Sequence, residues 1–416
     1  MADWKAKPLG QVCTIKPPKA EAKAKLSQGD EVSFAPMEDL GIGVKYLQPH
    51  RSRRLSEVSG SYTYFADGDV LLAKITPCFE NGKLGVARGL TNGVGFGSSE
   101  YIVLRPTSTL DAEFLYYYLA RPTFLEEGAR TMAGAVGHKR VTKEFIESYP
   151  IPLPPLPAQR RIVAILDEAF EAIATAKANT EKNLQNAYTL QSTLEEACFD
   201  GHLDRTFEPK ELDALCHLIV DCEHKTAPTQ ESGHPSIRTP NIGKGVLLLE
   251  GVNRVSEDTY RAWTRRAEPQ GGDLILAREA PAGNVAVIPE GSKVCLGQRT
   301  VLIRPKRDIL EPEYLAHLLL QSRSQAQLLA HSRGATVTHI NMKDIRAFEI
   351  THVPSLDVQR SAIGKLSDID EQCRSLAKAS TQKLAALDEL KKSLLHQAFT
   401  GALTAKSTDK ELAEAA

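Results

Sequence analysis

Pro154-Pro155-Leu156-Pro157-Ala158-Gln159-Arg160 opens a stretch of about forty residues without glycine or proline, which closes at Phe199-Asp200-Gly201-His202-Leu203. Two hundred residues later, Pro354-Ser355-Leu356-Asp357-Val358-Gln359-Arg360 opens a similar stretch that closes at Phe399-Thr400-Gly401-Ala402-Leu403 and contains one glycine, Gly364, near its start. Glycine and proline are the residues that interrupt helices, so each stretch predicts one long helix. The chain is therefore predicted to be an internal repeat with a period of about 200 residues.

Apolar residues in both stretches recur at alternating spacings of four and three, the heptad pattern of a coiled coil. Polar residues interrupt both patterns at the same place, at Thr180 and Asn183 and at Ser380 and Lys383. The segment between the two helices is a domain-sized globule, and domain termini usually lie close together, so we expect the helices to run antiparallel. The predicted coiled-coil core is Ile162, Leu166, Ile173, Leu190 and Leu194 in the first helix and Leu366, Ile369, Leu376, Leu387, Leu390 and Leu394 in the second.

The segment before each long helix mixes short strand-like runs with a helical stretch, as in 70–75, 101–104 and 112–119, and this mixture predicts an α+β globule. The two segments also repeat, because 67–73 parallels 271–277 and Val103-Leu104-Arg105-Pro106 parallels Leu302-Ile303-Arg304-Pro305, whereas the loops that follow differ. The predicted organisation is a first globule at 1–151, a proline turn and long helix at 152–204, a second globule at 205–350, a second long helix at 351–404 and a polar tail at 405–416.

The composition is that of an ordinary water-soluble protein, with 42% hydrophobic residues, 25% charged residues and a net charge of −1. Seven cysteines without a Cys-x-x-Cys pair predict reduced, mostly buried thiols. The sequence has neither a basic start followed by an apolar run nor a long uninterrupted apolar stretch, so a cytoplasmic location is expected. The near-zero charge excludes a polycation, and any affinity for nucleic acid must come from local patches or from a more basic partner.

The order of a globule, a Pro-x-Leu-x-x-Gln-Arg turn and a long helix ending in Phe-x-Gly-x-Leu, followed by a second copy of all three, resembles the specificity subunits of Type I restriction-modification systems. The second globule adds Asp221-Cys222-Glu223-His224-Lys225-Thr226-Ala227-Pro228, Ile237-Arg238-Thr239-Pro240-Asn241-Ile242 and Gly334-Ala335-Thr336-Val337-Thr338-His339-Ile340-Asn341, which are similar to segments of that family's target recognition domains. The resemblance covers the chain as far as Ala405. It implies that each globule reads one half of a bipartite double-stranded DNA sequence, while the helices set the spacing between the halves.

The resemblance also implies partners. These are two modification subunits that methylate adenine with S-adenosylmethionine, and two restriction subunits that use ATP with Mg. It implies no catalytic residue, cofactor or metal in this chain itself. The sequence agrees, since it lacks the Gly-x-x-x-x-Gly-Lys-Ser/Thr phosphate loop and the Asn/Asp-Pro-Pro-Tyr/Phe tetrapeptide of amino-methyltransferases.

Loop lysines and arginines neutralise phosphates, whereas arginine, asparagine, glutamine, serine and threonine can hydrogen-bond base edges. Each such side chain can equally be a solvated loop residue. The candidate DNA-binding residues are Lys74, Thr76, Lys83, Ser98, Ser99, His138, Lys139 and Arg140 in the first globule, and Lys225, Thr226, Arg238, Asn241, Arg278, Gln298, Arg299, Thr338 and His339 in the second.

Other interpretations have less support. Asp221, Cys222 and His224 could form a metal or nucleophile site, but one cysteine and one histidine without further ligands favour a scaffold turn. A coiled-coil adaptor that binds no DNA would explain the helices and the near-neutral charge, but not the two divergent globules. A DNA-modifying enzyme would need catalytic motifs that the sequence lacks.

Overall fold

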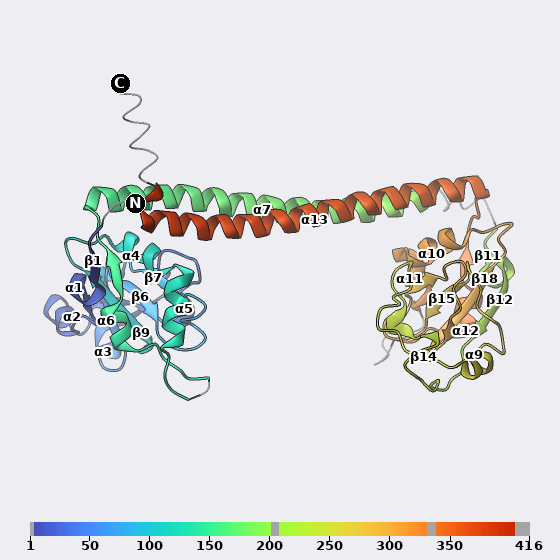
Figure 1. The fold of residues 1–416 in the computed structure, drawn as a ribbon, viewed down its shortest axis with the longest axis horizontal. Coiled ribbons are helices and arrows are strands. Elements are labelled where there is room, and N and C mark those ends of the chain that lie inside the picture. Colours follow the sequence, from blue (N-terminus) through green and yellow to red (C-terminus); the bar gives the residue numbers. More distant parts are fainter. Residues whose placement is uncertain (1–3, 136, 201–207, 331–337, 404–416) are drawn as a thin grey trace, which may run out of the picture. The chain divides into compact units, whose positions relative to one another are not determined.

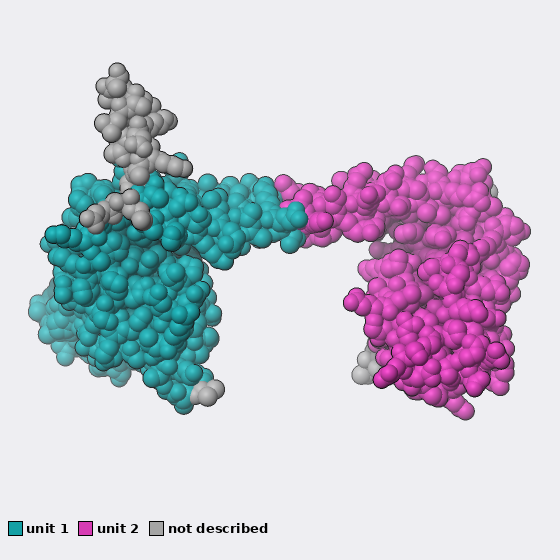
Figure 2. Space-filling model, in the orientation of Figure 1, with its two compact units in different colours: residues 1–181, 381–416 teal, residues 182–380 magenta. Residues whose placement is uncertain are grey.

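The computed structural model describes residues 4–135, 137–200, 208–330 and 338–403. The chain forms two units (Figure 2): unit 1 comprises residues 1–181 and 381–416, and unit 2 comprises residues 182–380. Each unit contains one globule and half of each long helix, because the second long helix returns to the first globule. The predicted segment boundaries at 151, 204, 350 and 404 stay predictions, since these units follow packing and not chain order.

Unit 1 contains two four-stranded sheets (Figure 1). The first, in the order β2-β9-β6-β7, is antiparallel and consists of β2 (Cys13–Ile15), β9 (Tyr101–Pro106), β6 (Val70–Ala73) and β7 (Leu84–Val86). The second has the order β4-β3-β8-β5 and consists of β4 (Arg51–Arg54), β3 (Glu31–Ala35), β8 (Val94–Gly97) and β5 (Thr63–Ala66), with β3 and β8 parallel. A short pair joins β1 (Ala6–Pro8) to β10 (Pro150–Pro152). The helices of the globule are α1 (Leu9–Val12), α2 (Ala20–Lys25), α3 (Leu55–Val58), α4 (Ala112–Leu119), α5 (Pro122–Arg130) and α6 (Lys143–Ser148).

Unit 2 repeats the first of these sheets in the same order, β12-β18-β15-β16, from β12 (Cys216–Asp221), β18 (Thr300–Pro305), β15 (Leu274–Ala277) and β16 (Val285–Val287). The smaller sheets consist of β14 (Arg254–Val255), β13 (His234–Ile237) and β17 (Cys295–Leu296), and of β11 (Lys210–Glu211) with β19 (Glu349–Ile350). The helices are α8 (Leu212–Leu215), α9 (Glu257–Trp263), α10 (Pro312–Leu320), α11 (Ser322–Leu328) and α12 (Met342–Arg346). The predicted α+β class and the internal repeat are confirmed.

The repeated sheet is held together by a repeated ion pair. In unit 1 the buried carboxylate of Asp69 accepts two hydrogen bonds from Arg105, at 2.6 and 2.8 Å. In unit 2 Asp273 accepts two from Arg304, at 2.8 and 2.7 Å. A bidentate arginine satisfies both oxygens of a carboxylate, which a buried charge requires. This explains why the Val-Leu-Arg-Pro and Leu-Ile-Arg-Pro strands of the sequence keep their arginines.

The long helices are α7 (Leu156–Asp200) and α13 (Leu356–Thr400), and within each unit their halves lie side by side (Figure 1). In unit 1 Lys177 of α7 pairs with Asp388 of α13. In unit 2 Gln191 of α7 lies 3.2 Å from Asp370 of α13. Later residues of α7 thus meet earlier residues of α13, and the predicted antiparallel pairing is confirmed.

Aromatic side chains attach the helix ends to the globules. Phe399, near the end of α13, packs edge-on against Phe114 and Tyr118 of α4, with ring centroids 5.1 and 5.0 Å apart. Phe199, near the end of α7, packs against Tyr314 of α10 at 5.2 Å. The phenylalanine of each Phe-x-Gly-x-Leu motif is thus an anchor. Gly401 has a φ of +80°, as expected of a helix stop, while Gly201 lies outside the described residues.

Part of the predicted coiled-coil core is wrong. Leu190 and Leu390 are 58% and 46% exposed, and Leu194 and Leu376 are also exposed. The heptad assumes 3.5 residues per turn, whereas a straight helix has 3.6, so the inner face advances by one residue beyond Thr180. Leu184 is therefore half-buried whereas Asn183 is exposed, and Leu395 is buried whereas the predicted Leu394 is half-buried. Of the other predicted core residues, Ile162, Leu166, Ile173 and Leu366 are buried, and Ile369, Leu387 and Leu394 are half-buried.

Among the described helices, including both long ones, none has an apolar stretch of the length and hydropathy needed to span a bilayer.

Candidate nucleic-acid interface

Three loop segments meet in unit 1, and we call them loop junction 1: residues 74–76 after β6, residues 98–100 before β9, and residues 138–141. The backbone joins them, because Lys74 N donates to Glu100 O and Val141 N donates to Lys74 O, both at 2.9 Å. Thr76 N likewise donates to Lys139 O at 2.9 Å. Segments separated by more than 60 residues in the sequence are thereby held in one place.

Unit 2 has the equivalent loop junction 2, formed by residues 278–280, 297–300 and 338–340. Arg278 N donates to Arg299 O at 2.9 Å, and Ile340 N donates to Arg278 O at 3.0 Å. Two of the three backbone connections of loop junction 1 thus recur in loop junction 2, although the side chains differ. Loop junction 1 thus contains seven of the eight candidate residues of the first globule, all except Lys83. Loop junction 2 contains five candidates of the second globule: Arg278, Gln298, Arg299, Thr338 and His339.

A carboxylate organises loop junction 1. Glu100 accepts from Nε and Nη2 of Arg140 at 2.9 and 2.8 Å. The third nitrogen, Nη1, donates to His138 O at 3.2 Å. Lys74 Nζ donates to Ser99 O at 2.9 Å and lies 3.8 Å from Glu100. The hydrogen bond from Arg140 lowers the pKa of Glu100 despite partial burial, and the charges of Lys74 and Arg140 lower it further.

Loop junction 2 also contains a carboxylate between cationic or basic groups. Glu279 lies 2.9 Å from Nε of Arg299 and 2.9 Å from Nδ1 of His339. Arg278 is only 8% exposed, and its guanidinium is bonded to Asp221 at 2.6 Å, to Ile340 O at 2.9 Å and to His339 Nε2 at 2.9 Å. Burial and these three hydrogen bonds make Arg278 a support for its neighbours, and its contact with DNA stays a prediction.

The remaining candidates occupy the edges of these junctions. Lys83 is tied to Met37 O at 2.9 Å, and the hydroxyl of Ser98 accepts from Glu100 N at 3.2 Å. Gln298 donates to His224 O at 3.3 Å, which brings it to the exposed Lys225 and Thr226. Asn241 accepts from Arg238 N at 3.1 Å, so its side chain is used within the turn.

Asp221, Cys222 and His224 offer three ligand atoms within 4.8 Å of one another. However, Asp221 Oδ2 lies 2.6 Å from Arg278 and 3.2 Å from His224, and burial raises the pKa of the Cys222 thiol. A guanidinium at that distance repels a cation. The segment serves as the far end of the loop junction 2 network, in agreement with the scaffold interpretation.

Sequence reasoning missed a basic edge strand. Arg51, Arg53 and Arg54 of β4 are all exposed, and the guanidinium of Arg53 lies 4.4 Å from the centre of the Phe34 ring. It also missed the lysines around α2. Burial lowers the pKa of Lys19, and the charges of Lys16 and Lys23 lower it further. Crowded exposed cations are typical of surfaces that bind phosphate. The clustering of basic residues in the sequence, at 51–54 and at 16–25, could have indicated the edge strand and the lysines.

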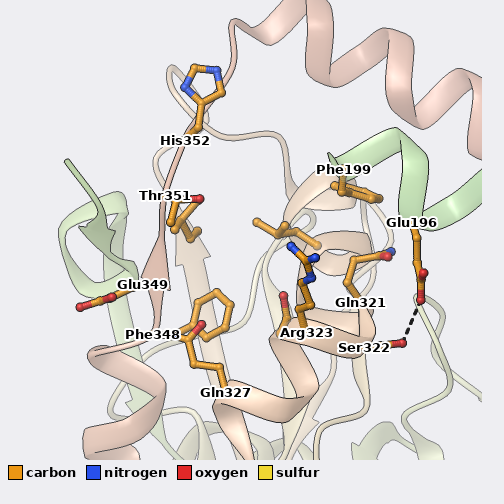
Figure 3. Close-up of a pocket in the computed structure, with 13 residues that line it drawn as sticks. Glu196, Phe199, Gln321, Ser322, Arg323, Gln327, Phe348, Glu349, Thr351 and His352 are labelled. Carbon is orange, nitrogen blue, oxygen red and sulfur yellow. Dashed lines mark hydrogen bonds between the residues drawn. The ribbon is translucent and has the colours of Figure 1, made fainter. Parts of the chain in front are cut away.

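A pocket of about 480 Å³ lies in unit 2 between the end of α7, the α10–α11 turn and β19 (Figure 3). Its wall includes Phe199, Arg323 and Phe348, and Ser322 donates to Glu196 across one side at 3.1 Å. At the equivalent place in unit 1, Arg121 stacks 3.6 Å over the ring of Tyr118 beside Phe399. The pocket thus forms where unit 2 has the smaller side chains of Leu318 and Gln321 in place of Tyr118 and Arg121. It is not a binding site that recurs in both units.

Comparison with known proteins agrees with this architecture. The profile of the family described as "Type I restriction modification DNA specificity domain" matches residues 1–186 and 208–386, and the chain belongs to this family. It is 40% identical over 162 residues to the specificity subunit of the Type I restriction enzyme EcoEI of Escherichia coli, covering 38% of this chain and 26% of that protein. It is also 40% identical over 148 residues to the EcoAI specificity subunit, covering 35% and 25%. These two matches span about a quarter of each relative's length.

Two solved structures resemble the whole chain. The crystal structure of the HsdS subunit from Thermoanaerobacter tengcongensis has a TM-score of 0.67 at 18% identity, covering 96% of this chain and 97% of that one. A structure described in a study of complex assembly and conformational transition of the type I R-M system has a TM-score of 0.71 at 20% identity, covering 97% and 99%. At these identities the similarity shows the fold.

Proposed function

We propose that this chain is the DNA-binding specificity subunit of a Type I restriction-modification complex and that each globule reads one half of a bipartite target. The observation that carries the proposal is the pair of loop junctions. Two backbone connections recur at equivalent positions in both junctions, but the side chains differ. A fixed scaffold with exchanged polar side chains suits two readers of unlike sequences. Membership of the specificity-domain family supports this function over a coiled-coil adaptor that binds no DNA.

The exposed basic groups divide by role in this proposal. Arg53 and Arg54 of β4 and the lysines around α2 suit phosphate contacts, which position a protein on the duplex and make its affinity salt-dependent. The polar side chains of the loop junctions suit base contacts. The chain itself would perform no chemistry, and it would act in the cytoplasm together with its DNA and its partner subunits.

We assign the partners from the same proposal: two modification subunits, which would methylate adenine with S-adenosylmethionine, and two restriction subunits, which would use ATP with Mg. Exposed leucines support two equivalent docking places for one kind of partner. Leu190 and Leu194 are exposed on α7 in unit 2, and Leu390 is exposed on α13 in unit 1 at the position equivalent to Leu190. Exposed apolar side chains that recur under an internal repeat favour a partner present in two copies.

The proposal is tested by coexpressing the chain with its modification subunit and sequencing the methylated bases of the host DNA. The expected result is one bipartite motif with two defined halves and a fixed spacer. Binding measured in parallel at stated salt should show preference for that motif over unrelated DNA of the same length. A complex that forms without any sequence preference, or a chain that recruits no modification subunit, would contradict the proposal.

A second experiment tests the helices as a spacer. One or two helical turns are inserted equally into α7 near Thr180 and into α13 near Ser380, where polar residues interrupt the apolar pattern of both helices. The methylated motif should then keep both halves but show a longer spacer. An unchanged spacer in a folded, active complex would refute the role of the helices in setting the distance.

A further inference from the structure

We propose that Arg140 and Arg299 each read a guanine, one in each half of the target, and that Glu100 and Glu279 are the positioning residues that aim them. This inference rests on the proposed DNA-binding function and names the base and the residues. Arginine reads guanine through two parallel N–H groups that face the O6 and N7 acceptors in the major groove. A reader must therefore keep that pair of donors free and hold its orientation.

Arg140 meets both requirements. Glu100 occupies the side edge of the guanidinium, formed by Nε and Nη2, and His138 O accepts one hydrogen of Nη1. A guanidinium has five N–H donors, so one hydrogen remains on each terminal nitrogen. We place His138 O on the Nη1 hydrogen nearer Cδ, so that the two remaining hydrogens form the outer edge. The side chain of Arg140 is 45% exposed. Its held side faces the protein and its open edge remains available.

Arg299 also meets both requirements, but its orientation is fixed mainly by its backbone conformation. Its side chain is 61% exposed, and its Nε lies 2.9 Å from Glu279. Its backbone has a φ of +64°, a conformation that non-glycine residues adopt rarely and at a cost in free energy. The bond from Arg278 N to Arg299 O holds it there. An exposed arginine kept in an unfavourable backbone conformation suggests that the direction of its side chain matters.

The groups behind Glu279 have a fixed hydrogen-bond polarity. Arginine has no acceptor, so in the contact between Arg278 Nη2 and His339 Nε2 the histidine nitrogen accepts. The proton of His339 is then on Nδ1, which donates to Glu279 Oε1 at 2.9 Å and leaves Oε2 facing Arg299. Asp221 holds the other end by accepting from Arg278 at 2.6 Å. The buried Arg278 thus orients the exposed Arg299 through two intermediate side chains.

The two loop junctions exchange the origin of these groups. Under the backbone correspondence, Glu100 occupies the position of Arg299, and Arg140 occupies the position of His339. The carboxylate therefore comes from the second segment in unit 1 and from the first segment in unit 2. The scaffold pairs Asp69–Arg105 and Asp273–Arg304 keep their positions instead. Both junctions therefore contain a glutamate–arginine pair, although its members come from different segments. This favours a role in presenting the arginine over a role in the common scaffold.

The carboxylates also distinguish base contact from phosphate contact. A carboxylate within 3 Å of a guanidinium cancels much of its attraction for a phosphate but leaves its directed N–H groups intact. Basic groups without such a partner suit phosphates better. The geometry therefore favours a base, and the two-acceptor edge of guanine is the one that an arginine fork fits.

The test uses the complex of the whole chain with its modification subunit and selects bound DNA from a library randomised in both half-sites. Arg299→Ala should reduce the preference for guanine at one position of the second half by about 10- to 100-fold, with all other positions unchanged. Arg140→Ala should do the same at one position of the first half. Arg261→Ala is the matched control, because Arg261 is an exposed arginine paired with Glu257 at 3.0 Å on α9 and belongs to none of the junction segments. It should change no preference.

Conservative variants separate base reading from phosphate binding and from misfolding. Arg299→Lys keeps the charge but has no fork, so it should lose the guanine preference as Arg299→Ala does. Glu279→Gln keeps the shape and should weaken the same preference with an unchanged thermal midpoint. Restored preference in the lysine variant, a uniform loss of affinity for all sequences, or unchanged preference in both alanine variants would overturn the inference. A wild-type complex without sequence preference would instead refute the proposed function itself.

Discussion

The side-chain oxygen of Gln159 accepts a hydrogen bond of 2.8 Å from the backbone amide of Asp111. Its side-chain nitrogen donates to Thr109 O at 2.9 Å and to Pro154 O at 2.8 Å, and the side chain is fully buried. Gln359 makes the same three contacts in unit 2, to Glu311 N, Ile309 O and Pro354 O. The glutamine of each Pro-x-Leu-x-x-Gln-Arg turn thus joins the start of a long helix to the start of α4 or α10.

Gln159→Ala should destabilise unit 1 by about 3–5 kcal/mol, because it leaves a cavity at a fully buried side chain and removes a hydrogen-bond partner from three backbone groups. Trp4 packs against the core of unit 1 and Trp263 lies in unit 2, so urea unfolding of variants that retain one tryptophan reports on each unit separately. The Trp4 transition should move to lower urea and the Trp263 transition should not. Gln185→Ala, at an exposed position of α7, is the control and should change stability by less than about 0.5 kcal/mol.

Phe399→Ala should destabilise unit 1 by about 3–5 kcal/mol, although Phe399 lies near the end of the chain. The reason is its burial against Phe114 and Tyr118 of α4. The same tryptophan-resolved unfolding applies, and Phe199→Ala should instead shift the Trp263 transition. A Phe399 variant that shifts the Trp263 transition alone would show that α13 is anchored elsewhere.

Leu190→Ser and Leu390→Ser should leave the stability of the isolated chain within about 0.5 kcal/mol, because both side chains are exposed. If the exposed leucines are docking places, each single variant should bind one modification subunit fewer than the wild type, and the double variant should bind none. Native mass spectrometry measures this stoichiometry. Ile309→Ser, at another exposed apolar position outside the long helices, is the control, and equal loss in that variant would contradict the assignment.

Cys13 and Cys216 should resist alkylation in the native protein at pH 8. Burial raises the pKa of each thiol to about 12, so only about one molecule in ten thousand carries a thiolate there. Raising the pH towards 10 should increase their reactivity by about tenfold per unit while the protein stays folded. Mass spectrometry after iodoacetamide treatment locates the label, with denatured protein as the reference. Rapid native labelling of either cysteine at pH 8 would show that its strand is open.

The repeat, the two long helices and the α4 helix at 112–119 could be predicted from the sequence because each depends on local pattern. Helix-breaking residues bound the helices, and the spacing of apolar residues determines which face is buried over a few turns. The prediction failed at Leu190 and Leu390, where a difference of a tenth of a residue per turn had accumulated. Nor could the sequence reveal the burial of Arg278, which depends on partners about sixty positions away in the chain.

The sequence by itself determined that this protein is a duplication of an α+β globule and a long helix, since covalent order and hydrophobic period are written in it directly. Only the tertiary structure decided which charged loop residues are exposed to solvent and which are fixed by hydrogen bonds to other loops. Glu100 and Glu279 attracted no attention in the sequence, yet each organises an arginine across loops that the fold brings together. Electrostatic pairing acts over a few ångströms in space, and the distance between two residues along the chain does not reveal it.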